Sequence, residues 1–149
     1  MSITKKETLP LEASMDFPAS SEFISTIRLA MSGIATNCNL DIDEIEDIKI
    51  AISEACNNAI QHAYSTESIN PRLKITINCD KKVFKISISD QGKGFDTSTI
   101  QSQNAQDNEK LGLGLGITFM KTLMDDVKLE STIDKGSTIT ISKKINAAH

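Results

Sequence analysis

The chain has 149 residues, a length typical of a single domain. Its content of 39% hydrophobic and 24% charged residues is enough for a buried core and excludes wholesale disorder. A formal net charge of -4 and an aromatic content of 4% argue against a nucleic-acid partner, because the chain is poor in both net positive charge and base-stacking rings.

The first predicted elements are an edge strand and a helix. A short edge strand is predicted over Thr8–Ala13, with the extended segment ending near Pro18. Apolar residues then recur at helical spacing as far as about Asn37. Ser20 or Ser21 offers a side-chain oxygen for the N-cap of this helix, which presents one apolar face.

A second and longer helix follows a short polar break. Asp41 or Asp43 is expected to cap its start, and the helix should end at about Tyr64. Its apolar stripe consists of six residues: Ile45, Ile48, Ile52, Ala55, Ala59 and Ala63.

The middle of the chain predicts a hairpin followed by a polar segment. Residues 65–72 form a polar loop, and the strands Leu73–Cys79 and Val83–Ser89 alternate apolar and polar residues. We therefore expect an antiparallel hairpin with one buried face. The segment after Asp90 has almost no apolar anchor, and residues of about 97–111 are predicted to be a functional lid.

The last part of the chain predicts one helix and two strands. The third helix is expected to begin in the run Gly112–Gly116, and strands Val127–Ile133 and Ser137–Ile145 flank a turn at residues 134–136. The whole order predicts an α+β fold, a two-layer sandwich with three main helices on one face of a mixed, mainly antiparallel sheet.

Glu54 and Asn58 are one turn apart on the predicted second helix, on a stripe beside its apolar face. A solvated helix face explains most such polar residues, although Asn57 and Asn58 are poor helix formers for mid-helix positions. An amide oxygen can bind Mg²⁺ together with substrate phosphates, which leaves the neighbouring carboxylate free to act as a base. The pair is therefore a candidate site for magnesium chemistry, with the solvated face as the alternative.

A second candidate site comes directly after the hairpin, in the sequence Asp90-Gln-Gly92-Lys-Gly94. The glycines permit positive φ angles and close approach of the backbone to a ligand. An aspartate at a strand end can accept a hydrogen bond from an exocyclic amine such as that of adenine. An ordinary turn would also be rich in Asp and Gly, so the motif alone leaves both interpretations open.

A third candidate site is the run Gly112-Leu113-Gly114-Leu115-Gly116. Glycines at a helix start expose backbone N–H groups at the positive end of the helix dipole, which favours phosphate. The run is not a P-loop, and it lacks the last glycine of the dinucleotide-binding fingerprint. Nucleotide binding here would therefore need a different fold.

These signals, taken in order along the chain, resemble the GHKL ATPase superfamily and its Bergerat nucleotide-binding fold. The segments Ile27–Gly33, Asp43–Tyr64 and Gly114–Val127 narrow the resemblance to the RsbW type of anti-sigma factor with serine-kinase activity. The similar part runs from about residue 17 to residue 143. We expect residues 1–149 to form one domain of this type.

The resemblance implies a role for individual residues of this sequence. Glu54 matches the catalytic base for the serine hydroxyl, and Asn58 matches the magnesium ligand. Asp90 matches the carboxylate that reads adenine, Thr138 matches a contact near it, and Arg28 matches a position that touches partner proteins. The nucleotide-binding positions also include the two glycine segments: Gly92, Gly94, Gly112, Leu113, Gly114, Leu115 and Gly116.

The resemblance also implies an activity, its cofactors and its partners. Proteins of this type sequester an alternative sigma factor of RNA polymerase. Using ATP and Mg²⁺, they phosphorylate a serine on an anti-anti-sigma protein of the STAS class, so this chain is expected to be an ATP-dependent protein-serine kinase. Members are commonly homodimers, and binding to DNA, RNA or a membrane is not expected.

Two other functions stay open at this point. The chain could be a module that binds ATP without catalysis and inhibits its partner by sequestration alone. It could also be the catalytic domain of a histidine kinase, although the short lid and the absence of a separate phospho-acceptor helix argue against that.

The cysteines and the hydropathy indicate the compartment. Cys38, Cys56 and Cys79 are too far apart in sequence for a typical zinc or redox dithiol motif, so we expect buried, reduced thiols. The sequence has no window near the roughly 18 apolar residues of a membrane span. We therefore expect a soluble cytoplasmic protein.

Overall fold

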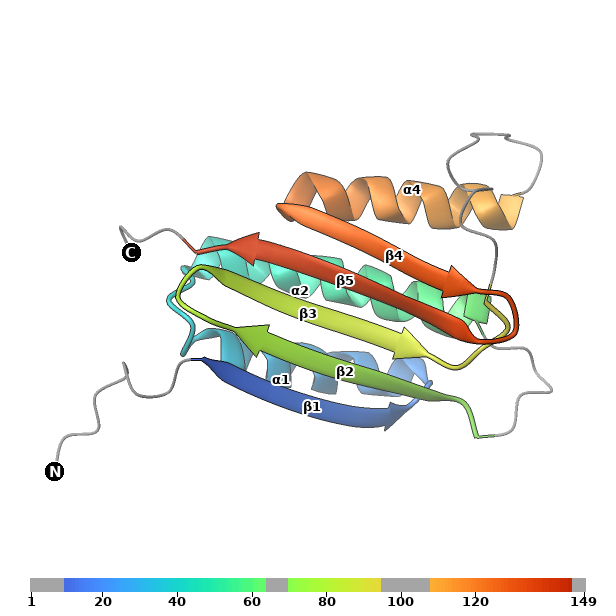
Figure 1. The fold of residues 1–149 in the computed structure, drawn as a ribbon, viewed down its shortest axis with the longest axis horizontal. Helices are drawn as coiled ribbons and strands as arrows, with labels where there is room; N and C mark the ends of the chain where they lie inside the picture. Colours follow the sequence, from blue (N-terminus) through green and yellow to red (C-terminus); the bar gives the residue numbers. More distant parts are fainter. Residues whose placement is uncertain (1–9, 64–69, 95–107, 146–149) are drawn as a thin grey trace, which may run out of the picture.

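The structure, a computed structural model, describes residues 10–63, 70–94 and 108–145, with only the backbone described for residues 62–63 and 108–114. Five strands form one sheet, and the helices cover one of its faces (Figure 1). The predicted α+β two-layer sandwich is therefore confirmed. The strands are β1 (Leu11–Pro18), β2 (Arg72–Cys79), β3 (Val83–Asp90), β4 (Asp126–Thr132) and β5 (Gly136–Lys144).

The sheet has the strand order β1-β2-β3-β5-β4, and all four neighbouring pairs are antiparallel. The prediction of a mixed sheet is therefore wrong for the described strands. The hairpin of β2 and β3 is confirmed. β1 is an edge strand as predicted, but it covers Leu11–Pro18 rather than Thr8–Ala13, because the apolar side chains that alternate toward the helices continue to Phe17.

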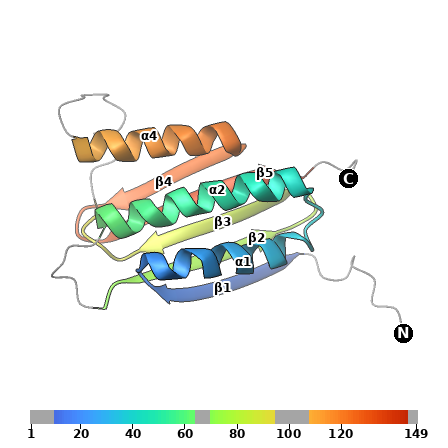
Figure 2. The ribbon, with the colours of Figure 1, turned by 180° about the vertical axis from the view of Figure 1, so that it is seen from behind.

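Helices α1 (Ile24–Ala35) and α2 (Ile42–Asn58) lie side by side on the sheet (Figure 2). Asp41 caps α2 in a full capping box, since its carboxylate accepts from the Glu44 N–H at 2.8 Å and Glu44 accepts from the Asp41 N–H at 3.0 Å. The predicted serine cap of α1 is wrong, because a 3-10 turn η2 (Ser21–Phe23) precedes the helix and Phe23 occupies the N-cap position.

The third helix, α4 (Asn108–Leu123), begins earlier than predicted. Its first turn lies in the segment assigned to the lid, so the last four residues of the predicted lid, 108–111, are helical. Residues 97–107 of that prediction lie outside the described part of the chain. Residues Asn108 to Lys110 are compatible with a helix, so α4 can begin there. The prediction placed the start of the helix at the glycine run 112–116 because glycines often mark helix ends.

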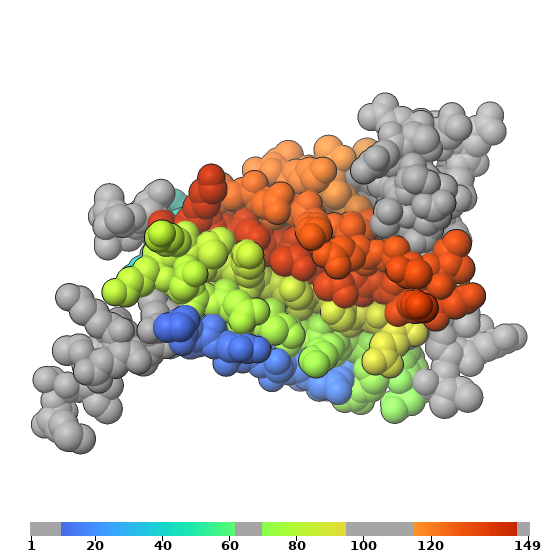
Figure 3. Space-filling view, in the orientation of Figure 1, coloured from blue at the N-terminus to red at the C-terminus, as the bar shows by residue number. Residues whose placement is uncertain are grey.

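The core lies between the sheet and the helices. Strand residues that share a register row point to the same side, so Ile77, Ile86, Ile141 and Val127 form one buried row beneath the helices. The opposite face, visible in the space-filling view, carries hydroxyl and charged side chains (Figure 3). Among the described residues, the helices are too short or too polar to cross a membrane.

Candidate active site

The described ends of three elements meet at one end of the molecule: the C-terminal end of α2, the C-terminal end of β3 and the N-terminal part of α4 (Figures 1 and 2). α2 continues directly into a π-helical segment η3 (Ala59–Ala63), which packs against β3 and β5. Single π-helical turns inside helices are frequent at functional sites because they change the direction of side chains. The geometry therefore directs attention to the last turns of α2.

Glu54 and Asn58 meet Gly116 of α4. A Cβ atom placed on Gly116 would lie 2.7 Å from Glu54 Oε1 and 2.9 Å from Asn58 Nδ2. Glu54 is partly exposed, whereas Asn58 is only 6% exposed and its Nδ2 has no hydrogen-bond partner among the described residues. The structure thus brings the predicted base and the predicted magnesium ligand to one place, and their alternative reading as a solvated helix face does not hold for Asn58.

The buried amide of Asn58 fits a role in ligand binding. Nearly all buried polar groups have hydrogen-bond partners, so an unpartnered buried amide requires an explanation. Its other atom, Oδ1, is an oxygen ligand of the kind that Mg²⁺ takes when substrate phosphates supply further ligands. The donor set is therefore compatible with a magnesium–nucleotide complex held through Asn58.

Asp90 ends β3 as a buried carboxylate that is 7% exposed. Burial raises the pKa of Asp90, while hydrogen bonds from the backbone N–H groups of Gly92 and Ser137 partly offset that shift. The Gly92 N–H donates to Asp90 Oδ1 at 2.9 Å. Two backbone donors thus fix the carboxylate, which leaves acceptor positions for a ligand amine.

Two glycines allow the backbone to close around Asp90. Gly94 has φ of 60°, and a Cβ there would lie 2.0 Å from the carbonyl oxygen of Thr132. Gly136 has φ of 94°, and a Cβ there would lie 2.2 Å from the carbonyl oxygen of Asp90. Any side chain would clash with backbone at either position. The predicted positive φ angle is found at Gly94 but not at Gly92, and the close approach at Gly94 is to the backbone of Thr132; approach of this segment to a ligand stays a prediction.

Gly136 and Ser137 lie beside Asp90 in the structure, and the sequence reasoning named neither of them, since it assigned Thr138. In the register of β3 and β5, Asp90 is opposite Ser137, whereas Thr138 is opposite Ser89 and bonds to its hydroxyl at 2.9 Å. Because side chains alternate along a strand, Thr138 lies on the open face of the sheet, away from the Asp90 side chain. Residues two apart in a strand point to the same face, so a buried residue at Ile139 places Ser137, and not Thr138, on the face that Asp90 shares.

The glycine run of residues 112–116 lies inside α4, not at its start. In an α-helix only the first four N–H groups lack an intrahelical acceptor, and here they belong to residues 108–111. The predicted exposure of N–H groups at Gly112, Gly114 and Gly116 is therefore wrong for this conformation. Leu113 lies within the same helix, and the side chain of Leu115 is 62% exposed.

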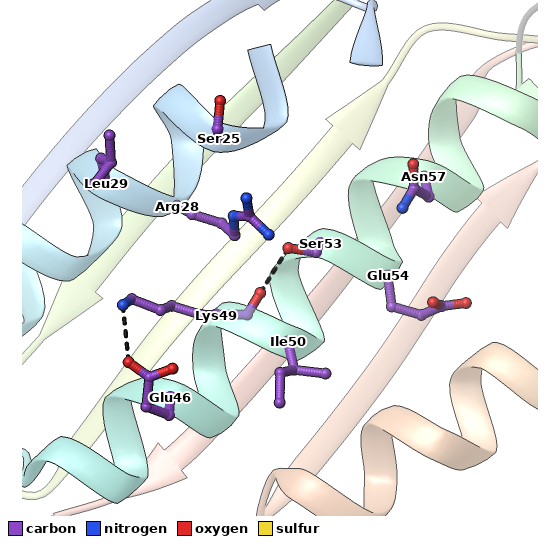
Figure 4. Close-up of a pocket in the computed structure, with 9 residues that line it drawn as sticks. All are labelled: Ser25, Arg28, Leu29, Glu46, Lys49, Ile50, Ser53, Glu54 and Asn57. Atoms are coloured by element: carbon purple, nitrogen blue, oxygen red, sulfur yellow. Dashed lines mark hydrogen bonds and ion pairs between the residues drawn. The ribbon is translucent and has the colours of Figure 1, made fainter. Parts of the chain in front are cut away.

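A groove of about 600 Å³ lies between α1 and α2 and reaches Glu54. Figure 4 shows Arg28 pointing from α1 toward α2, and Glu54 pointing from α2 toward α4. Lys49 pairs with Glu46 at 2.9 Å on the same wall. Arg28 is exposed, as is Leu29 beside it, so the predicted partner-contact residue lies on accessible surface in the groove that Glu54 also lines.

Comparison with known proteins gives a family for the chain. Residues 17–143 match the model of the histidine kinase-like ATPase domain. The chain is 37% identical over 139 residues to the serine-protein kinase RsbW of Bacillus licheniformis, with 89% of this chain and 84% of that protein covered. It is 40% identical over 134 residues to the serine-protein kinase RsbW of Staphylococcus epidermidis, with 86% and 82% covered.

Solved structures show the same fold. The RsbU and RsbW domains of a Mycobacterium tuberculosis protein match with a TM-score of 0.67 at 18% identity, over 91% of this chain and 32% of that one. A histidine kinase domain from Erythrobacter litoralis matches with a TM-score of 0.52 at 14% identity, over 87% and 62%. The chain belongs to the histidine kinase-like ATPase family, and within that family it is of the RsbW type.

Proposed function

We propose that this chain is an ATP- and Mg²⁺-dependent protein-serine kinase and an anti-sigma factor. It phosphorylates a serine on an anti-anti-sigma protein of the STAS class, and it binds an alternative sigma factor so that RNA polymerase cannot. The relatives named serine-protein kinase RsbW support the kinase assignment. The observation that carries the proposal is the convergence of Glu54 and Asn58 on Gly116.

Glu54 is the general base of the proposed reaction. Glu54 is partly exposed and lines one end of the α1–α2 groove, with its side chain directed toward α4, so a docked serine would reach it from this side. Glu54 accepts the hydroxyl proton while the serine oxygen attacks the γ-phosphorus in line and the bond to the β-phosphate oxygen breaks. Most of the rate enhancement comes from positioning and charge stabilisation, and the base supplies a smaller part.

Asn58 and Asp90 hold the two ends of the nucleotide. Asn58 Oδ1 would be the protein ligand of Mg²⁺, which would supply neutralisation of the charge on the phosphates. Asp90 accepts a hydrogen bond from the adenine amine, with Gly92, Gly94 and Gly136 shaping the surrounding backbone. In this proposal Ser137 replaces Thr138 as the residue beside the carboxylate.

Phosphate binding by the glycine run requires a local change in α4. The N–H groups of Gly112 and Gly114 are directed at carbonyls of the preceding turn. We propose that α4 unwinds around the phosphates only as far as Gly114, at a low cost because glycine has a weak helix propensity, while the helix from Leu115 onward keeps its place against α2.

The partner surface includes Arg28 and the neighbouring groove. The guanidinium projects over the groove that ends at Glu54, and Leu29 and Ile50 add exposed apolar surface. Both the sigma factor and the STAS protein are proposed to use this side. Arg28→Glu should weaken both complexes while leaving ATP affinity unchanged, and an unchanged affinity for both partners would remove Arg28 from the proposal.

A homodimer is the proposed assembly, formed without nucleic acid or membrane. β1 is at the edge of the sheet, where its outer backbone groups are available to another chain. Sedimentation equilibrium of the free chain tests the proposal, because a concentration-independent monomer mass contradicts it.

The experiment that tests the function is phosphoryl transfer. The chain is incubated with labelled ATP, Mg²⁺ and candidate STAS proteins encoded in the same genome, and the modified residue is mapped by mass spectrometry. Acid-stable phosphoserine on the STAS protein supports the kinase. Partner binding without transfer would leave the sequestration module, and an acid-labile phosphate would favour a histidine kinase.

A further inference from the structure

Gly116 of α4 packs against the Glu54 and Asn58 side chains. A Cβ there would lie 2.7 Å from Glu54 Oε1, 2.9 Å from Asn58 Nδ2 and 3.6 Å from Asn58 Oδ1. The first two distances are shorter than carbon makes with oxygen or nitrogen in contact. The carboxylate and the amide therefore occupy the space that any side chain at residue 116 would need.

In the described conformation, a direct contact with phosphate does not explain why residue 116 is a glycine. Gly116 lies more than two turns inside α4, so its N–H is directed at the carbonyl of Gly112. Gly116 is also buried. What its missing side chain provides here is room for two side chains of α2.

The position of Gly116 over these residues is fixed from the other end of α4. Lys143 Nζ donates to the carbonyl oxygen of Leu123 at 2.6 Å and to Asp47 Oδ2 at 3.2 Å. Leu123 is the last residue of α4, and Asp47 lies two turns before Glu54 on α2. One ammonium group thus ties the C-terminal end of α4 to α2, two turns from both Gly116 and Glu54.

We infer that Gly116 is a positioning residue: through its contact from α4 it fixes the orientations of the Glu54 carboxylate and the Asn58 amide. The inference rests on the proposed function, in which Glu54 is the base and Asn58 the magnesium ligand. Packing against the glycine leaves few orientations to both side chains, and Asn58 Nδ2 has no hydrogen bond to hold it otherwise among the described residues. A shift of α4 at Gly116 would therefore move both groups together.

Gly116→Ala tests this inference, with Gly33→Ala as the matched control. Gly33 is also a helical glycine, but a Cβ there would meet no atom within 4 Å. The methyl at residue 116 should displace both groups by up to about 1 Å, which lowers kcat for transfer by about 10- to 100-fold. The KM for the acceptor protein and the Mg²⁺-free ATP affinity should not change, while the Mg²⁺ needed for half-maximal ATP binding rises.

The control variant, and Gly116→Ala combined with Glu54→Asp, distinguish a positioning role of Gly116 from a direct contact of Gly116 with phosphate. Gly33→Ala should change none of these values. In a Glu54→Asp background the carboxylate withdraws by one methylene, so the methyl at residue 116 meets only Asn58 and Gly116→Ala should cost less in kcat than it does in the wild-type chain. A loss of Mg²⁺-free ATP affinity with unchanged kcat, or an equal cost in both backgrounds, would overturn the inference.

Two further results keep the inference separate from the proposed function. If the wild-type chain transfers no phosphate, the proposed kinase activity is wrong. The Mg²⁺ concentration that ATP binding requires, compared between the wild-type chain and Gly116→Ala, still tests whether Gly116 positions Asn58. If Gly116→Ala unfolds, the double variant Glu54→Ala/Gly116→Ala should melt at a higher temperature, because Oε1 no longer meets the methyl. An equal melting temperature of the single and double variants would contradict the contact.

Discussion

Asp90 and Ser137 face each other across β3 and β5, and the Ser137 N–H donates to the Asp90 carboxylate. The pair places a fixed acceptor at the end of the sheet, beside the turn that Gly136 makes possible. The carboxylate keeps few contacts with water, since it is 7% exposed. Its burial therefore has a cost in stability that a bound nucleotide amine could offset.

Asp90→Asn should stabilise the free chain at neutral pH. Burial raises the pKa of Asp90 above the value of 3.8 that it has when unperturbed, so the ionised group opposes folding at pH 7. The variant's gain in melting temperature should be largest above the raised pKa and should disappear as the pH falls toward 3.8. Melting curves of both chains between pH 7 and pH 3.5 check this sign.

The same variant should lose ATP affinity, because an amide presents an N–H₂ group where the adenine amine needs an acceptor. Isothermal titration at pH 7 measures the loss. A variant that is less stable at pH 7 and binds ATP normally would contradict both the role of burial and the role in adenine binding.

Asn58→Ala should raise the Mg²⁺ concentration needed for nucleotide binding. The variant removes Oδ1, the proposed protein ligand, while the metal keeps its phosphate and water ligands. The Mg²⁺-free affinity for ATP should change little. Ser53→Ala is the control, since Ser53 Oγ donates within α2 to the Lys49 carbonyl; an identical Mg²⁺ dependence of Asn58→Ala and wild type would contradict the assignment.

Lys143→Met should destabilise the fold by about 1–3 kcal/mol, because it leaves the Leu123 carbonyl and Asp47 without this donor. Lys128→Met is the matched control. Lys128 pairs with Glu130 at 3.0 Å, but both side chains are exposed, so a change of about 0–1 kcal/mol is expected. Urea unfolding of both variants tests the difference, and equal losses would argue that Lys143 does not tie α4 to α2.

The cysteines should be unreactive in the folded chain. Cys38, Cys56 and Cys79 are buried free thiols, as predicted, and burial raises the pKa of Cys56 to about 12. Because the thiolate is the reactive form, iodoacetamide at pH 8 should label none of them rapidly before urea is added. Mass spectrometry counts the adducts. Fast labelling of the native chain would show that this part of the core opens easily.

Much of the fold could be predicted because its patterns are local. The alternation in β2 and β3 predicted the hairpin nearly to the residue, whereas the stripe of α2 predicted a helix to about Tyr64 although the α-helix ends at Asn58 and continues as the π-helical η3. The capping signals left Asp41 and Asp43 open, and the structure selects Asp41, which has a glutamate three residues later; the serine signal was misleading because a 3-10 turn intervenes. The start of α4 was missed because glycines signal a helix end as readily as a beginning.

The site was predictable only in part, because its residues come from different elements. The spacing of Glu54 and Asn58 placed them on one stripe, but no pattern shows that Gly116 packs against both. Likewise, Ser137 and Thr138 are neighbours in sequence, and only the pairing with β3 decides which one shares a face with Asp90. Such relationships depend on register and packing between distant segments.

The central claim is that Glu54 acts as the base in serine phosphorylation, and Glu54→Gln tests it most directly. With labelled ATP, Mg²⁺ and a STAS acceptor, the wild-type chain should produce phosphoserine. The variant should bind ATP with unchanged affinity and transfer phosphate about 10²- to 10⁴-fold more slowly, the range for loss of a general base. Transfer at the wild-type rate by Glu54→Gln would contradict the account.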